Sequence, residues 1–216
     1  MMDTLFSAGD FRRRARSQSG SPVEDAWREH GDFLLNPDVI PHLETLKLRD
    51  AAVLVPVIED GDEARVIFTQ RTATMRKHSG QVAFPGGAVD PEDRSVEVAA
   101  LREAQEEIGL DPGRVEIIGR LPEYVTVTSY RVTPVIGLIE QPLDLAALQL
   151  DAFEVAEAFE VPLAFLMDPR NHERRHVVMG ELSRTFYAMP YEGARRYFIW
   201  GATAAMLRNL YQLMRA

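Results

Sequence analysis

The chain has 216 residues, of which 46% are hydrophobic and 26% charged, an ordinary composition for a soluble protein with one large domain. Its formal net charge of −9 argues against nucleic acid as a partner, and the absence of cysteine excludes disulfides, thiolate metal sites and cysteine nucleophiles. No stretch approaches about 18 uninterrupted apolar residues, and residues 1–20 lack the apolar core of a secretory signal. We therefore expect a cytoplasmic protein that does not bind membranes.

The first 48 residues carry only short, separate patterns. The run FRRRAR (11–16) is typical of a solvated helical face or a loose arm. SQSGSP (17–22) predicts a flexible break, and PDVIPHL (37–43) indicates short helical or irregular pieces. We interpret residues 1–48 as an N-terminal extension that packs on a main domain of residues 49–216.

The main domain begins with a predicted β-hairpin. AAVLVPVIE (51–59) and ARVIFTQR (64–71) are apolar, β-branched runs on either side of a turn that contains glycine. Further strands are expected within 115–124, 132–140, 152–166, 176–180 and 185–193. A C-terminal amphipathic helix is expected from the apolar spacing of Ile199, Ala202, Met206, Leu210 and Leu213. The order of elements predicts an α+β fold with helices packed on a mixed sheet.

A helix with crowded carboxylates is predicted over residues 95–108. Ser95 can cap its start, and Gly109 stands where a left-handed C-terminal residue is favoured. Glu103, Glu106 and Glu107 converge on one flank, at a cost of roughly 0.2–0.5 kcal/mol per like-charged pair. This cost is small enough that the three glutamates could simply form a solvated face, on which Arg102 pairs with Glu106. A site for a hard divalent cation is the alternative, favoured by the glycine pair of FPGG (84–87) just upstream.

The segment GGAVDPEDRSVEVAALREAQEEIGL (86–110) resembles the Nudix box, G-x5-E-x7-R-E-U-x-E-E-x-G-U, in which U is aliphatic. The second half matches at every fixed position: Arg102, Glu103, Ala104, Glu106, Glu107, Gly109 and Leu110. The first half departs from the pattern, because Ala88 and Arg94 stand where glycine and glutamate are required. Counting forward from Gly87 instead places Asp93 at the acidic position, as a shortened substitute one residue early.

This resemblance implies a Nudix hydrolase domain over 49–216, an α/β/α sandwich with a mixed sheet and the box as loop–helix–loop. It also implies hydrolysis of a nucleoside diphosphate derivative with Mg²⁺ or Mn²⁺ as cofactor. Glu103 and Glu107 then correspond to metal ligands, and Glu106 ligates directly or through water. Gly87 offers its carbonyl to a metal or allows the turn, and Arg102 orients the glutamates.

The preceding segment, IFTQRTATMRKHSGQVAFPGG (67–87), resembles the motif of the coenzyme A pyrophosphatase branch of this family, L-L-T-x-[TR]-[SA]-x3-R-x3-G-x3-F-P-G-G. Residues 127–137 and 198–207 also look like this branch. The branch implies hydrolysis of coenzyme A to 3′,5′-ADP and 4′-phosphopantetheine. It provides the candidates for substrate binding: Arg71, Arg76, Lys77, Gly80, Phe84 and Gly86. Arg76 could instead brace its loop, and His78 is typical of an ordinary polar loop residue.

Several choices stay open in the sequence. Glu154 and Glu157 are candidates for a general base outside the box, or simply residues of a strand rim. Tyr124 and Tyr130 could stack on adenine or pack in the core. The alternatives to coenzyme A are another nucleoside diphosphate derivative, such as ADP-ribose or NADH, and a noncatalytic ligand sensor. The complete set of box acids argues against the sensor, and no pattern indicates an oligomeric state.

Overall fold

The computed structural model describes residues 8–17, 35–60, 63–73, 79–139, 141–179 and 182–215. Within these residues eight strands form one mixed sheet: β1 (Arg49–Asp60), β2 (Glu63–Arg71), β3 (Val82–Ala83), β4 (Gly86–Ala88), β5 (Val115–Arg120), β6 (Tyr124–Val125), β7 (Tyr130–Ile139) and β8 (Val155–Pro162). Strand β1 pairs with β7 in parallel and with β2 and β4 in antiparallel fashion. The pairs from Val57–Val66 to Asp60–Glu63 confirm the predicted hairpin.

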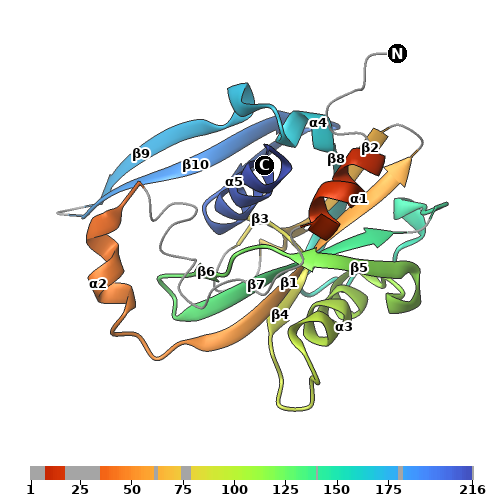
Figure 1. Ribbon diagram of the computed structural model, residues 1–216, viewed down its shortest axis with the longest axis horizontal. Helices are drawn as coiled ribbons and strands as arrows, with labels where there is room; N and C mark the ends of the chain where they lie inside the picture. The colour runs from red at the N-terminus through yellow and green to blue at the C-terminus, as the bar shows by residue number, and fades with distance from the viewer. Residues whose placement is uncertain are drawn as a thin grey trace.

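The central strand β1 is buried on both faces of the sheet, as expected where helices cover both sides. Ala52, Leu54 and Ile58 pack in a cluster with helix α3 (Val96–Ile108), whereas Val55 and Val57 pack in the cluster that includes helix α5 (Ala202–Arg215). Figure 1 shows α3 on one side of the sheet and α5 on the other. This arrangement confirms the expected α/β/α sandwich with a mixed sheet.

A second sheet of three strands, in the order β11-β10-β9, follows the main sheet in the chain. It consists of β9 (Glu173–Met179), β10 (Leu182–Glu192) and β11 (Arg196–Trp200). The prediction that Ile199 opens the C-terminal helix was wrong, because Ile199 pairs with Met189 in this sheet and the helix begins at Ala202. Gly201, with a φ of 62°, separates strand from helix in a left-handed conformation that few other residues tolerate.

Short helices connect or follow the strands of the two sheets. They are η4 (Pro112–Arg114), η5 (Leu145–Ala147), α4 (Leu163–Leu166) and η6 (Pro169–Asn171). The strand expected within 152–166 therefore ends at Pro162, and α4 begins at Leu163. None of the helices in the described part of the chain combines the length and the apolar character that a membrane span requires.

The N-terminal residues include helix α1 (Ala8–Ser17), η3 (Pro37–Val39) and α2 (Ile40–Leu43), so short helical pieces occur around 37–43 as expected. Of the two alternatives for FRRRAR (11–16), the helical face is confirmed by α1 and the loose arm was wrong. Phe11 is fully buried, and Arg12 forms ion pairs of 2.7 Å with Glu59 and with Glu116. The break expected at 17–22 lies outside the described residues beyond Ser17. The division into 1–48 and 49–216 stays a prediction.

Replacing Phe11 with alanine tests whether α1 belongs to the folded core. We expect Phe11→Ala to lower the free energy of unfolding by about 3–5 kcal/mol, because the ring is fully buried in the cluster shared with α5. Arg13→Ala, an exposed position of the same helix, is the control and should change it by about 0.5 kcal/mol or less. Urea denaturation measures both. A loss below about 1 kcal/mol for Phe11→Ala would show that α1 is dispensable for stability.

Candidate active site

Helix α3 carries the acidic cluster and begins and ends where the sequence predicts. The Ser95 hydroxyl accepts a hydrogen bond from the Val98 amide at 3.3 Å, and Gly109 ends the helix with a φ of 67°. Ala100, Ala104 and Ile108 have no solvent exposure and pack in the cluster that includes β1. Because this face packs against the sheet, the orientation of the flank that carries the glutamates is fixed.

Arg102 is the centre of a hydrogen-bond network that ties the loop before α3 to the glutamates. Its Nε and Nη2 atoms donate to both oxygens of Asp93, at 3.1 and 2.9 Å, and Nη2 also donates to the Ala88 carbonyl at 3.1 Å. Its Nη1 atom donates to Glu103 at 2.9 Å and to Glu106 at 3.2 Å. Hydrogen bonds from Arg102 hold the pKa of Asp93 below its usual range, despite opposing desolvation. Asp93 therefore pairs with Arg102 although it lies one residue early in the box.

Glu107 is the most deeply buried acid of the cluster, with 4% of its surface exposed. The Gly86 amide donates to its Oε2 atom at 3.3 Å, and Arg71 Nη1 lies 3.6 Å from its Oε1 atom. Burial raises the pKa of Glu107 to about 7; Arg71 and the Gly86 amide oppose this shift, and the charges of Glu154 and Glu103 add to it. Burial also raises the pKa of Glu103. The cluster thus holds carboxylates whose negative charge is only partly compensated.

Two glycines allow the loop to approach both the sheet and the acids. A Cβ atom on Gly86 would lie 2.4 Å from the Ala52 carbonyl oxygen, so β4 could not pair with β1 as closely. A Cβ atom on Gly87 would lie 2.5 Å from Oε2 of Glu103. Gly87 therefore leaves the space that the Glu103 carboxylate fills.

The donor set suits a hard cation such as Mg²⁺ or Mn²⁺, because it consists of carboxylate oxygens on one flank of α3 beside Gly87. Within the described residues, however, no three His, Asp or Glu side chains are gathered tightly enough to hold an ion as they stand. Oxygens of Glu103 and Glu106 are bound to Arg102, and Glu107 faces Arg71. The residues fit a metal once Arg71 leaves Glu107 and the oxygens of Glu103 and Glu106 that Arg102 does not bind turn toward the cation.

Replacing Gly87 with alanine should weaken metal binding while the fold is kept. The added methyl group displaces the Glu103 carboxylate, and errors of this kind in the support of a metal site typically cost about 10- to 100-fold in affinity. We expect this loss in Mn²⁺ binding measured by electron paramagnetic resonance. Gly9→Ala is the control, because a Cβ atom there meets nothing within 4 Å. Equal Mn²⁺ affinities for Gly87→Ala and wild type would show that Glu103 is not a metal ligand.

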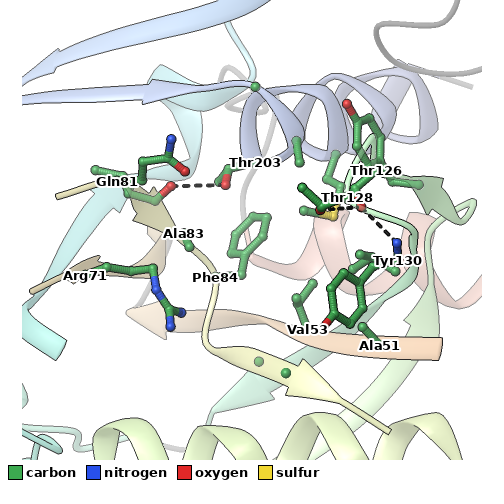
Figure 2. A pocket seen from close by; sticks show the side chains of 18 of the residues that line it. Ala51, Val53, Arg71, Gln81, Ala83, Phe84, Thr126, Thr128, Tyr130 and Thr203 are labelled. Atoms are coloured by element: carbon green, nitrogen blue, oxygen red, sulfur yellow. Dashed lines mark hydrogen bonds between the residues drawn. The ribbon is translucent and has the colours of Figure 1, made fainter. Parts of the chain in front are cut away.

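A cavity of about 520 Å³ opens beside Gly86 and Gly87. Its walls come from β1, β3, β4, β6 and β7, from the ends of β2 and β11, and from the start of α5. Figure 2 shows Arg71 and Gln81 on one side of this pocket and Thr126 and Tyr130 on the other, with Phe84 between them. The volume lies within the roughly 300–1,000 Å³ that is usual for small-molecule sites. The pocket and the acidic cluster therefore meet at the two glycines.

The residues proposed for substrate binding are distributed unevenly around this pocket. Arg71, Phe84 and Gly86 line it, although Phe84 is buried and stacks on Phe68 at 5.0 Å. Gly80 does not line it and lies in an exposed turn, where its carbonyl accepts a hydrogen bond from Gln70. The predictions for Arg76, Lys77 and His78 fall outside the described residues. Tyr124 and Tyr130 both line the pocket.

The two candidate bases have different surroundings. Glu154 accepts a hydrogen bond from Arg71 Nη2 at 3.1 Å, and its charge acts on both Glu103 and Glu107. Glu157 lies on β8, where it forms an ion pair with Arg195 and accepts a hydrogen bond from the Tyr197 hydroxyl at 2.8 Å. The structure therefore connects Glu154, through Arg71, to the acidic cluster.

Sequence reasoning missed several residues that line the pocket, among them Thr126, Thr128, Trp200, Thr203 and Met206. A signal for most of them was present in the segments 127–137 and 198–207, which resemble the coenzyme A pyrophosphatase branch. These segments lie far apart in the chain and meet only because β7 and the start of α5 flank the same cavity.

Several known proteins of one family resemble this chain. A family model described as the NUDIX domain matches residues 48–181. A curated relative, "Uncharacterized Nudix hydrolase NudL" of Escherichia coli O7:K1, is 43% identical over 177 residues, which are 82% of this chain and 88% of the relative. The protein of the same name from Shigella boydii serotype 4 is 44% identical over the same shares. A solved structure, the Nudix hydrolase RenU of M. smegmatis, has a TM-score of 0.45 at 26% identity, covering 53% of this chain and 71% of that one. The chain belongs to the Nudix hydrolase family.

Proposed function

We propose that this chain is a metal-dependent hydrolase of coenzyme A that produces 3′,5′-ADP and 4′-phosphopantetheine. Nudix hydrolases act on nucleoside diphosphate derivatives, and the 67–87 motif supports coenzyme A as the particular substrate. The observation that carries the proposal is the position of Arg71. This motif residue lines the pocket and also contacts Glu107 and Glu154. It is therefore placed to bind a phosphate that lies between the pocket and the acids.

The acidic cluster would position the diphosphate for attack by water. Glu103 and Glu107, with Glu106 and the Gly87 carbonyl, would hold Mg²⁺ or Mn²⁺. When bound, these ions neutralise the diphosphate and lower the pKa of the attacking water. Arg102 keeps the glutamates oriented through the network that includes Asp93. Arg71 exchanges its carboxylate contacts for the substrate phosphate, which its planar donors suit.

Glu154 is the general base in this proposal. Its carboxylate lies beside Arg71 at the edge of the acidic cluster and is about half exposed, so water can reach it. It would accept the proton of the water that attacks phosphorus while the phosphoanhydride bond breaks. Glu157 is less suited, because Arg195 and Tyr197 already occupy its oxygens.

A comparison of substrates tests the proposed function. Purified protein with Mg²⁺ or Mn²⁺ should hydrolyse coenzyme A with a kcat/KM about 100-fold or more above that for ADP-ribose or NADH, since a site that pairs with polar groups of one substrate rejects analogues that lack them. Chromatography should show 3′,5′-ADP and 4′-phosphopantetheine as the products. EDTA should abolish turnover, and added Mn²⁺ should restore it. A preference for ADP-ribose or NADH would reject coenzyme A and keep the family chemistry, whereas full turnover in EDTA would reject both.

A further inference from the structure

The cavity beside β4 carries almost no charge. Among the described residues that line it, Arg71 is the only one with a charged side chain, and its guanidinium group contacts Glu107 and Glu154. Figure 2 shows Arg71 on the opposite side of the pocket from Thr126 and Tyr130. The interior therefore offers little electrostatic stabilisation to a phosphate group.

The three threonine hydroxyls of the pocket bond to other protein atoms. Thr203 Oγ1 donates to the Val82 carbonyl at 3.1 Å. The Thr126 and Thr128 hydroxyls lie 3.0 Å apart, and Thr126 also accepts a hydrogen bond from the Tyr130 amide at 3.0 Å. These bonds appear as dashed lines in Figure 2 where both partners are drawn. A nucleobase needs donors and acceptors along its edge, whereas the part of the wall formed by these threonines is better suited to an aliphatic chain with few polar groups.

Exposed apolar side chains extend the lining toward solvent. Val127 is 68% exposed and Trp200 is 36% exposed, and both line the pocket. The Trp200 ring centre lies 5.4 Å from that of Phe186 and 6.4 Å from that of Phe198, so the apolar surface continues beyond the cavity. Apolar groups gathered at the mouth of a ligand pocket mark a binding surface more often than isolated ones do.

We propose that this pocket holds the uncharged arm of the substrate and that Val127 and Trp200 contact an apolar group at the end of that arm. The inference rests on the proposed function, for which the arm is pantetheine and the apolar group is an acyl chain on its sulfur. The arm begins beside Gly87, which lines the pocket and also packs against the Glu103 carboxylate, and hence next to the phosphoanhydride that is cleaved. The charged nucleotide half then binds outside the cavity.

Direct binding tests the inference without any hydrolysis. The sequence contains two tryptophans, Trp27 and Trp200, so Trp27→Phe leaves Trp200 as the only tryptophan and as a reporter at the pocket. S-hexanoylpantetheine, which has no phosphate, should change the Trp200 fluorescence in a saturable manner. The nucleotide product 3′,5′-ADP should leave it unchanged. A response to 3′,5′-ADP but not to S-hexanoylpantetheine would place the nucleotide in the pocket and overturn the inference.

Kinetics with a matched pair of variants tests the role of Val127. Hexanoyl-coenzyme A should have a KM about tenfold below that of coenzyme A at a similar kcat, because the buried methylenes are bound equally in the ground and transition states. Val127→Ser should reduce this preference about three- to tenfold. Val178→Ser is the control, because Val178 is 64% exposed on β9 and does not line the pocket.

The outcomes separate this inference from the proposed function. An unchanged preference in Val127→Ser, or an equal rise in KM for both substrates, would overturn the contact with the acyl chain. If S-hexanoylpantetheine binds at Trp200 but no coenzyme A compound is hydrolysed, the proposed function fails and the pocket assignment stands. If coenzyme A is hydrolysed without any response of Trp200 to S-hexanoylpantetheine, the function stands and the inference fails.

Discussion

Replacing Glu107 with glutamine is expected to lower kcat about a thousandfold or more while the fold is kept. Glutamine has nearly the size and helix propensity of glutamate, so α3 should form normally. The site loses the anionic oxygen of its most buried acid, which a hard cation requires. Metal ions in such sites supply several kcal/mol of transition-state stabilisation, and each 1.4 kcal/mol corresponds to about a factor of ten in rate. Steady-state kinetics at saturating Mg²⁺ or Mn²⁺ measures the loss.

The same variant should be more stable than wild type when metal is removed. A carboxyl group with a pKa of about 7 in the folded protein and an ordinary pKa in the unfolded chain binds more protons in the folded state between those values. Wild type therefore loses stability as the pH rises through this window, and glutamine avoids the loss. In EDTA we expect Glu107→Gln to gain up to about 3 kcal/mol at pH 8 and little at pH 4.

Glu97→Gln is the matched control on the same helix. Although burial opposes it, hydrogen bonds from Ser95, the Glu97 amide and Arg120 hold the pKa of Glu97 below its usual range. The ionised Glu97 therefore contributes stability that is present at neutral pH and lost in acid, so Glu97→Gln should lower stability at pH 8 and leave kcat nearly unchanged. Thermal melts of Glu107→Gln and Glu97→Gln measure these opposite changes in stability. A Glu107→Gln protein with a rate within a few-fold of wild type would mean that the metal lies elsewhere.

Replacing Glu154 with glutamine should lower kcat by about 10²–10⁴, the range typical of a lost general base. Glutamine keeps a carbonyl that can accept the hydrogen bond from Arg71, which limits the structural disturbance. The pH–rate profile should become flatter on its acid side, which the loss of a purely structural contact would not cause. Mn²⁺ affinity should stay close to that of wild type, since Glu154 is not proposed as a ligand.

Glu157→Gln is the comparison for this prediction, because the sequence offers both acids as candidates. Glu157 is held by Arg195 and Tyr197, so its loss should affect local packing and leave kcat within a few-fold of wild type. A collapse of kcat in Glu157→Gln with normal turnover in Glu154→Gln would transfer the role to Glu157. Normal turnover in both variants would show that neither acid accepts the proton.

The helix that carries the acids was predictable in detail from local sequence. Its cap at Ser95, its left-handed end at Gly109 and its buried alanine face all follow from residues within one turn of each position. Local prediction failed at Ile199, whose apolar spacing fits a helix and a strand equally well. Pairing with Met189, ten positions earlier in the chain, decided between them. The packing of Phe11 was missed for the same reason, because its partners lie in distant elements.

By itself, the sequence determined the Nudix family, the layered α/β/α class and the acids of α3, because these depend on short-range spacing and helix geometry. Only the tertiary structure decided which of those acids is buried. Glu103, Glu106 and Glu107 look equivalent in the sequence, but they differ in burial, and Glu107 contacts Arg71. The tertiary structure also decided that Asp93 pairs with Arg102 and that Glu154 is connected to the cluster through Arg71, whereas Glu157 binds Arg195 and Tyr197. The pocket exists only in three dimensions, because strands from one half of the chain and a helix from its end enclose it. Spacing along a chain encodes periodicity, whereas burial and charge environment depend on which distant segments pack together.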